Sequence, residues 1–494
     1  MTEALWSAEE AIAATGGTGP SAWRAHGVSI DSRSLLVGDL FVALAGPNFD
    51  GHDFVAEALS KGAAAAIVHR QPSELPGDLP DDAPLLVVED SLEALCDLAR
   101  ASRRRTNARI CGVTGSSGKT STKEALKACL SPQGKTFASA GSLNNHWGVP
   151  LSLARLPKTA DYAVFEMGMN HAGEIAELSD LVRPDVAVIT TIGLAHIEFF
   201  DSQEGIADAK SEVFQGMSPQ GTAVLPRDDR FYERLVGKAA AAGLTKILSF
   251  GRHEEADARL INADLYETCS AVQAELRGKP VDFCLAQPGA HWVTNALAVL
   301  SAITALGADP VTAAAELSRL QPVSGRGARR KLPLPDGQAA LLIDESYNAN
   351  PDSVKAALAV LGRAKPEGAG RRIAVLGDML ELGGQGPAYH AALAEAVTDA
   401  NVDLAFLCGP QMAHLGRALP PSRVAALAVD SATLAPQVAE ALLPGDVVLV
   451  KGSLGSRMRV VIAALDALAP DSQEASDTEA SSDQPAAPRA ANGG

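Results

Sequence analysis

Residues 109–130 read RICGVTGSSGKTSTKEALKACL, and this stretch decides the fold. An apolar run is followed by a glycine-rich turn and then by apolar residues at helical spacing, which predicts a strand, a tight turn and a helix that begins near Lys119. Such a turn is typical of phosphate-binding loops, because backbone N–H groups and a helix N-terminus then face the phosphates. The sequence therefore predicts a nucleotide-binding loop in a parallel α/β sheet.

The candidate phosphate-binding residues form the turn and the start of the helix: Gly115, Ser116, Ser117, Gly118, Lys119 and Thr120. Lys119 is expected to reach the terminal phosphates and Thr120 to hold Mg²⁺. The strict pattern G-x-x-x-x-G-K-[ST] has glycine at the position that Val113 takes in this chain. An ordinary strand-to-helix turn therefore stays open as the alternative.

Three further side chains follow predicted strands of the same sheet. Glu166 ends the run DYAVFE, and His196 comes just after the run VAVITTIG. Because the carboxyl ends of parallel strands line the ligand crevice, Glu166 is expected to be a magnesium ligand there. Lys210 lies on the next predicted helix, where it is equally compatible with a solvated lysine or one that pairs with Glu212.

The order of the predicted elements divides the chain into three domains and a tail. Residues 1–108 form a small α/β domain, and residues 109–328 form a central domain with a mostly parallel sheet. Residues 329–468 again alternate strands and helices, which predicts a doubly wound, Rossmann-like domain. Residues 469–494 are rich in Ser, Ala, Asp, Glu and Pro and are expected to be disordered. The basic stretch 103–107 is interpreted as a solvated linker between the first two domains.

Composition excludes several classes of function. The 494 residues include 42 Lys and Arg against 59 Asp and Glu, a formal net charge of −17, which argues against a nucleic-acid or anionic-membrane surface as the main partner. The six cysteines have no paired spacing, so neither a disulfide framework nor a zinc cluster is expected, and a reducing cytoplasm fits best. No apolar run reaches the roughly 18 residues of a membrane span.

Taken together, these motifs resemble the Mur ligases, the ATP-dependent amide-forming enzymes of peptidoglycan synthesis. The resemblance rests on TGSSGKT at 114–120, Glu166, His196, ADAKSE at 207–212, PGAH at 288–291 with Asn295, Arg326 and Asp344. Three more stretches are similar to those of the members that add D-alanyl-D-alanine to UDP-N-acetylmuramoyl-tripeptide: DESYNANP at 344–351, VLGDMLELG at 375–383 and VKGS at 450–453. The resemblance extends over residues 28–463.

This resemblance implies a role for each domain and for particular residues. The three domains would bind the UDP-sugar substrate, ATP and the incoming dipeptide, in that order. The implied substrate-binding residues are Ser29, Ser32, Arg33, Asn48, Asn144, Asn145, Tyr347, Asn348 and Asn350. Asn295, Arg326 and Asp344 would contact the nucleotide, and the implied catalytic residues are Lys119, Lys210, His196 and Arg326. The implied magnesium ligands are Thr120, Glu166, His196 and Lys210, the last as a carbamate formed with CO₂.

The implied reaction has two steps, formation of an acyl phosphate from ATP and its displacement by the amine of the dipeptide. A monomer that acts in the cytoplasm on UDP-N-acetylmuramoyl-tripeptide and D-alanyl-D-alanine is expected, without nucleic acid or membrane insertion. Two alternatives stay open: another amide ligase of the same superfamily, such as a folylpolyglutamate synthase, and a nucleotide-hydrolysing switch without ligase activity. The third residue of the peptide is not determined by the sequence.

Overall fold

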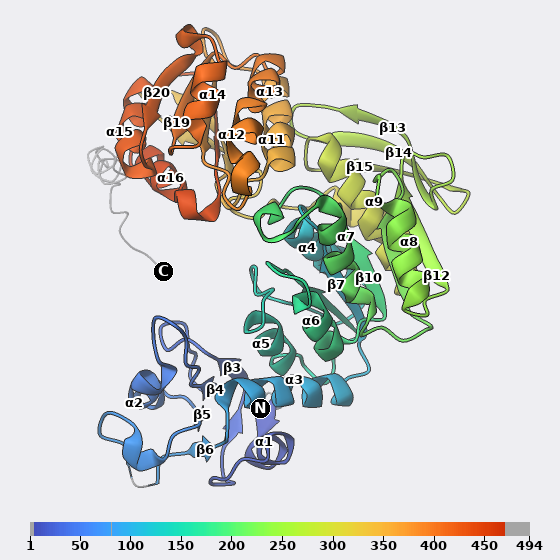
Figure 1. Cartoon of the computed structure of the whole chain (residues 1–494), viewed down its shortest axis with the longest axis vertical. Coiled ribbons are helices and arrows are strands. Elements are labelled where there is room, and N and C mark those ends of the chain that lie inside the picture. Colours follow the sequence, from blue (N-terminus) through green and yellow to red (C-terminus); the bar gives the residue numbers. More distant parts are fainter. Residues whose placement is uncertain (1–3, 81, 470–494) are drawn as a thin grey trace, which may run out of the picture.

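The chain folds into three α/β units, each built around its own sheet (Figure 1). This computed structural model describes residues 4–80 and 82–469. It confirms the predicted three-part α/β fold. The predicted tail lies outside the described residues except for Ala469, and the boundaries between the domains, at 108/109 and 328/329, stay predictions.

The N-terminal unit holds a four-stranded parallel sheet in the order β3-β4-β5-β6. The strands of this sheet are β3 (Gly27–Ser29), β4 (Asp39–Val42), β5 (Ala65–Val68) and β6 (Leu85–Val87). A separate two-stranded ribbon consists of β1 (Trp6–Ser7) and β2 (Arg24–Ala25). The helices of this unit are α1 (Ala8–Thr15), α2 (Val55–Ser60) and α3 (Ser91–Arg105). The capping box expected from Ser7 and Glu10 is confirmed, and α1 ends at Gly16 in the left-handed conformation.

The expected linker at 103–107 is wrong, because residues 103–105 form the last turn of helix α3. Asp90 caps this helix through the N–H groups of Leu92 and Glu93. The Arg103 guanidinium donates hydrogen bonds to the Val182 and Arg183 carbonyl oxygens, which belong to the central unit. Basic side chains at a helix C-terminus are favourable, and here they also attach the N-terminal unit to its neighbour.

The central unit is a nine-stranded sheet in the order β15-β14-β13-β12-β11-β10-β7-β9-β8. Its strands are β7 (Arg109–Thr114), β8 (Thr136–Ala138), β9 (Tyr162–Glu166), β10 (Val186–Ile189), β11 (Thr222–Pro226), β12 (Lys246–Gly251), β13 (Ala258–Leu265), β14 (Ser270–Leu276) and β15 (Lys279–Leu285). Its helices are α4 (Lys119–Leu130), α5 (Gly148–Ala154), α6 (Glu174–Val182), α7 (Gln203–Ser211), α8 (Tyr232–Ala241), α9 (Ala290–Ala305) and α10 (Pro310–Leu317). The antiparallel patch expected from the alternating segments is β13-β14-β15.

Helices cover both faces of this central sheet, as the buried strand β7 requires. Cys111 and Val113 pack into one core with α4, α9 and α10. Ile110 points to the other face and packs into a second core with α5, α6, α7 and α8. Because side chains alternate along a strand, a strand with apolar side chains on both faces needs a layer on each side.

The C-terminal unit is a six-stranded sheet in the order β16-β17-β21-β18-β19-β20. Its strands are β16 (Ala328–Pro333), β17 (Ala339–Glu345), β18 (Arg372–Gly377), β19 (Leu404–Cys408), β20 (Val424–Ala428) and β21 (Val447–Lys451). Its helices are α11 (Pro351–Arg363), α12 (Gly386–Ala391), α13 (Leu393–Asp399), α14 (Met412–Ala418), α15 (Ser431–Ala441) and α16 (Arg459–Asp466). The expected hairpin joins β16 to β17 through Gly337, whose φ of 80° suits glycine.

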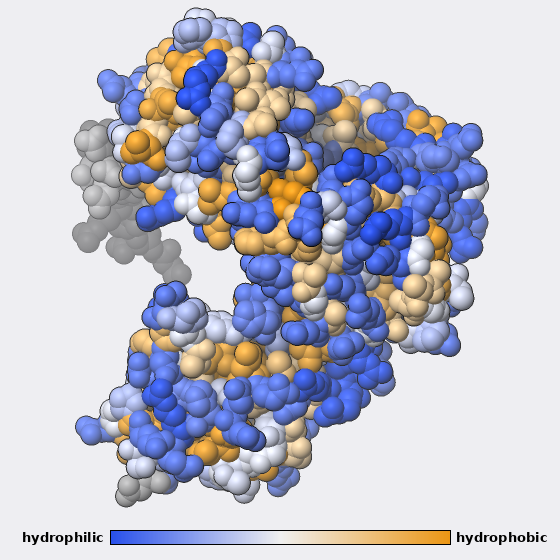
Figure 2. All heavy atoms as spheres, viewed as in Figure 1, coloured by the Kyte–Doolittle hydropathy of each residue, from blue (hydrophilic) through white to orange (hydrophobic). Residues whose placement is uncertain are grey.

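The central unit lies between the other two, and the N-terminal and C-terminal units face each other across an open space on one side of the molecule (Figure 2). The chain therefore has the shape of an open clamp in this structure. In the two described ranges, none of the helices combines the length and the apolar character needed to cross a bilayer.

Candidate active site

The glycine-rich turn between β7 and α4 has the backbone conformation that the sequence predicts. Gly115 and Gly118 have φ values of 146° and 82°, and a Cβ at Gly115 would lie 1.9 Å from the Thr190 hydroxyl oxygen. The Thr190 hydroxyl donates a 2.5 Å hydrogen bond to the Ser117 carbonyl oxygen. Val113 lies within strand β7, one residue before the loop begins to turn, so glycine is needed at 115 rather than at 113.

Lys119, Thr120 and Glu166 meet at the start of helix α4. The Lys119 ammonium donates to the Gly115 carbonyl oxygen at 2.8 Å, and the Thr120 hydroxyl donates to Glu166 Oε2 at 2.7 Å. The other carboxylate oxygen of Glu166, which is 1% exposed, accepts from Asn144 Nδ2 at 2.7 Å. Burial lowers the pKa of Lys119 and Arg326 lowers it further, whereas Glu166 raises it.

Lys210 is buried, so the alternative of a solvated lysine on a helix surface is wrong. It is 1% exposed, and its ammonium lies 3.7 Å from the Met169 sulfur. The pairing with Glu212 does not form, since that carboxylate accepts from the Gly173 N–H at 2.7 Å. Burial places the pKa of Lys210 well below its usual value, and the positive charge of Lys119 lowers it further.

His196 lies at the junction of the central and C-terminal units. Its Nδ1 lies 2.6 Å from Glu381 Oε2, at an angle outside that of a regular hydrogen bond, and this pairing lowers the pKa of Glu381. Both residues have left-handed backbone conformations, with φ of 66° and 61°. Within residues 4–80 and 82–469, no three His, Cys, Asp or Glu side chains come together as a metal site.

Arg326 follows the central unit and points back toward it. Its guanidinium lies over the Tyr347 ring, 4.0 Å from the ring centroid, and donates to the Ser142 hydroxyl at 3.2 Å. The Asp344 carboxylate accepts from the N–H groups of Gly325 and Ser346 at 3.1 and 3.0 Å. Asp344 therefore fixes the two backbone segments that carry Arg326 and Tyr347.

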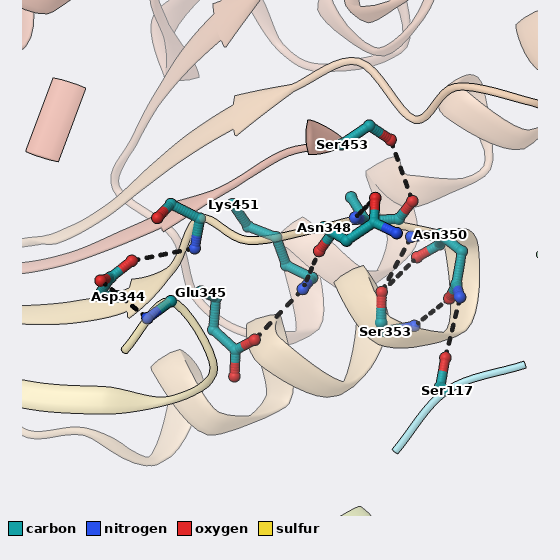
Figure 3. A network of polar contacts seen from close by, with 11 residues as sticks. Ser117, Asp344, Glu345, Asn348, Asn350, Ser353, Lys451 and Ser453 are labelled. Atoms are coloured by element: carbon teal, nitrogen blue, oxygen red, sulfur yellow. Dashed lines mark hydrogen bonds and ion pairs between the residues drawn. The ribbon is translucent and has the colours of Figure 1, made fainter. Parts of the chain in front are cut away.

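Asn348 and Asn350 lie on the loop between β17 and α11 (Figure 3). The buried Lys451 ammonium donates to the Asn348 carbonyl oxygen at 2.9 Å and lies 3.3 Å from Glu345 Oε2. Asn350 caps α11 by accepting from the Ser353 N–H, and its Nδ2 donates to the Ser117 hydroxyl at 2.9 Å. The C-terminal unit thus contacts the glycine-rich loop directly.

These contacts surround one cavity of about 590 Å³ between the central and C-terminal units. The predicted site residues that line it are Ser116, Ser117, Gly118, Lys119, Thr120, Asn144, Asn145, Glu166, His196, Asn295, Arg326, Tyr347, Asn348 and Asn350. Asn295 lies against the glycine-rich loop, since a Cβ at Gly118 would be 2.9 Å from its Nδ2. Gly115, Lys210 and Asp344 are buried and do not line the cavity.

The four predicted residues of the N-terminal unit lie apart from this cavity. Ser29 and Ser32 are buried, Asn48 is exposed, and the exposed Arg33 pairs with Asp31 at 2.7 Å. The Phe49 ring, next to Asn48, nevertheless packs edge-on against Trp147, with 6.0 Å between the ring centroids, and Trp147 follows the cavity-lining Asn145 by two residues.

Lys123, Ser142 and Glu345 are among the polar residues at this site that sequence reasoning missed. Ser142 and Glu345 line the cavity, and Lys123 is fully buried beneath it. Lys123 follows Thr120 by three residues on α4, and this helical spacing places the two side chains on one face. That spacing was the available signal, whereas nothing near Ser142 in the sequence distinguishes it from an ordinary loop serine.

Comparison with known families covers most of the chain. Residues 24–103 match the model described as Mur ligase family, catalytic domain; residues 113–303 match Mur ligase middle domain; and residues 334–454 match Mur ligase, glutamate ligase domain. A UDP-N-acetylmuramoyl-tripeptide–D-alanyl-D-alanine ligase of Escherichia coli strain K12 is 37% identical over 442 residues, covering 89% of this chain and 93% of that protein. The enzyme of the same name from Rickettsia prowazekii is 33% identical and covers 93% and 99%.

Solved structures agree with these relatives. A crystal structure of MurF from Acinetobacter baumannii has a TM-score of 0.80 at 32% identity and covers 94% of this chain and 99% of that one. MurF ligase from Thermotoga maritima in complex with ADP has a TM-score of 0.72 at 30% identity and covers 90% and 97%. With matches across all three units, the chain belongs to the Mur ligase family.

Proposed function

We propose that this chain is an ATP-dependent ligase that joins D-alanyl-D-alanine to UDP-N-acetylmuramoyl-tripeptide in peptidoglycan precursor synthesis. One observation carries the proposal: a single cavity brings the phosphate-binding loop together with Arg326 and the loop at 345–350 from the C-terminal unit. A switch that only hydrolyses a nucleotide has no need for residues of a second unit that face the phosphate-binding loop across the cavity. The close relatives named as ligases for these substrates support the same reading.

ATP would bind with its phosphates at the N-terminus of α4. The first-turn N–H groups of a helix favour anions, and Lys119 adds a positive charge beside them. Asn295, on helix α9, lies against the glycine-rich loop, as expected of a residue near the adenine base of ATP. The relative from Thermotoga maritima, whose structure is a complex with ADP, supports the binding of an adenine nucleotide by this chain.

The donor set around Thr120 fits Mg²⁺. The Thr120 hydroxyl and the Glu166 carboxylate lie 2.7 Å apart, and both are the hard oxygen ligands that Mg²⁺ prefers. When bound, Mg²⁺ would neutralise charge on the phosphates. Lys210 would add an oxygen ligand only as a carbamate, whose formation is favoured by the burial that lowers the pKa of this amine. His196 would have to leave Glu381 to join them.

The chain's own residues would act mainly by positioning and by electrostatics. The terminal carboxylate of the tripeptide attacks the γ-phosphorus of ATP, the bond to ADP breaks, and an acyl phosphate forms. Lys119 and Arg326 would stabilise the negative charge on the transferred phosphoryl group. The dipeptide amine then attacks the acyl carbon, loses a proton and expels phosphate. Tyr347, Asn348 and Asn350 would hold the dipeptide beside the acyl phosphate.

The UDP part of the substrate would bind the N-terminal unit at Ser29, Ser32, Arg33 and Asn48, and Asn144 and Asn145 would contact the substrate nearer the transferred phosphate. The contact between Phe49 and Trp147 supports a path from that unit to the cavity. We further propose that the protein acts as a monomer in the cytoplasm.

A phosphate-release assay tests the ligase proposal. ATP, UDP-N-acetylmuramoyl-tripeptide and D-alanyl-D-alanine are each omitted in turn, and phosphate is expected only with all three present. Sustained phosphate release that is indifferent to the dipeptide would instead support a nucleotide-hydrolysing switch.

We also expect the clamp to close during turnover. The proposed substrates contact three units, whereas two of those units face each other across an open space here (Figure 2). Binding of an ATP analogue and both substrates should therefore lower the radius of gyration in small-angle X-ray scattering, with bending near Arg105 and Arg329. An unchanged radius of gyration at saturation would contradict closure.

A further inference from the structure

A buried ammonium group lies directly beneath the active-site loop 139–145. Lys123 has no exposed surface, and its Nζ donates to the carbonyl oxygens of Ser139 and Gly141, each at 2.6 Å. The Glu124 carboxylate oxygen Oε1 lies 2.8 Å from the same nitrogen. A lysine ammonium has three N–H donors and no acceptor, so the two carbonyl oxygens use two of its donors, and the Glu124 carboxylate adds an ion pair.

Loop 139–145 carries side chains that hold the reacting region together. The Ser142 hydroxyl accepts from Arg326 and lies 3.5 Å from the Thr120 hydroxyl. The side-chain amide of Asn144 donates to Glu166, and the backbone carbonyl oxygen of Asn144 accepts from the Gly168 N–H at 2.8 Å. The loop therefore touches the phosphate-binding helix, the proposed magnesium ligand and Arg326, which lies just before the C-terminal unit.

The arrangement around Lys123 is that of a small cation site. Two backbone carbonyl oxygens and one carboxylate converge on a single positive charge, as oxygens converge on a bound metal cation. Without that charge, the Ser139 carbonyl oxygen would be buried without this hydrogen bond, and the partly buried Gly141 carbonyl oxygen would lose its bond to the same donor. Helix α4 thus supplies, from one face, both Thr120 for the site and a cation that shapes the loop opposite it.

We propose that Lys123 is a positioning residue that acts as a built-in monovalent cation: its ammonium orders loop 139–145 and so places Ser142 and Asn144 for phosphoryl transfer. The inference rests on the proposed function for its effect on turnover, but not for its effect on the loop. Ordering of the loop would require a positive charge with hydrogen-bond donors at the position of the Lys123 ammonium. It would not require that this charge be covalently attached to helix α4.

Chemical rescue tests this requirement. In Lys123→Ala, kcat for ligation should fall about tenfold or more, because a displaced loop misplaces reacting groups. Propylammonium has the four non-hydrogen atoms that the substitution removes and carries the same positive charge, so it should raise kcat in a saturable way. The uncharged isostere 1-propanol should not. If 1-propanol restores as much activity as propylammonium, or if neither restores any, the cation role is overturned.

Lys123→Met provides a second variant in which the aliphatic volume stays but the charge is lost. It should lose activity like the alanine variant without responding to propylammonium, because the site is filled. Full activity of the folded methionine variant would overturn the proposal even if the alanine variant failed to fold. Lys127→Ala, at an exposed position of the same helix, should retain the parent kcat under every condition.

Hydrogen exchange separates this proposal from the proposed function. Backbone amides of residues 139–145 should exchange faster in Lys123→Met than in the parent, while those of the β18 core stay protected. A parent chain with no ligase activity would refute the proposed function alone. Unchanged exchange in the loop would refute the role of Lys123 alone.

Discussion

Lys119→Ala is expected to lower kcat for ligation at least about 100-fold while the protein stays folded. The Lys119 ammonium lies at the N-terminus of α4, within the cavity, and its protein contact is the carbonyl oxygen of Gly115, four residues earlier. Its charge is thus available for the phosphoryl group, and no other side chain depends on it for a hydrogen bond among the described residues. Steady-state kinetics and circular dichroism on one preparation measure both parts of the prediction.

The same variant should not lose thermal stability. Burial lowers the pKa of Lys119 in the folded chain, so keeping this group charged opposes folding at neutral pH, and its removal relieves that cost. Lys127→Ala, on the exposed side of the same helix, is the control and should match the parent in rate. A Lys119→Ala protein that keeps more than about a tenth of the parent rate would exclude the proposed role of this ammonium.

Lys210→Ala is expected to lose most of its activity, about tenfold or more, if the lysine carries the carbamate that the family resemblance implies. A carbamate forms when the uncharged amine attacks CO₂ and loses a proton, and burial lowers the pKa of Lys210, which favours that uncharged form. Small carboxylic acids such as formate or acetate should partly restore the rate, because they supply the missing anion.

Two measurements distinguish this role from a structural one. In the parent enzyme labelled with ¹³CO₂, a carbamate carbon signal should be present, and it should be absent from the Lys210→Ala protein. The control is Lys238→Ala. Lys238 is a half-exposed lysine on helix α8 that pairs with Asp208 on α7, the helix that carries Lys210, and its loss should leave both the signal and the rate unchanged. An alanine variant at 210 as active as the parent would leave the carbamate without a function.

The phosphate-binding loop could be predicted from the sequence because its structure is local. Gly115 and Gly118 provide backbone conformations that other residues rarely adopt, and the apolar strand and the helix on either side fix the direction of the chain. The hairpin at Gly337 and the capping box of α1 have the same character. In each case a few neighbouring residues contain the whole physical reason for the structure.

The sequence did not reveal helix α3 at 103–105 or the surroundings of Lys210. A run of arginines reads as solvated because guanidinium groups are costly to bury, yet Arg103 finds its acceptors about 80 residues away on α6. Lys210 is likewise compatible with an exposed face until Met169 and the rest of the core are packed around it. Burial is a property of the assembled units and cannot be obtained from local spacing.

Local patterns in the sequence predict the order of most elements, the main sheet of each unit and the chemical types that the site contains. The tertiary structure alone decided which of those groups meet: Asn350 with Ser117, Arg326 with Ser142, and Lys123 with the carbonyl oxygens of Ser139 and Gly141. The physical reason is that periodicity and backbone conformation act between near neighbours in the chain. Hydrogen bonds and burial act between groups that folding brings together, as with Asn350 and Ser117, whose separation in the chain is 233 residues.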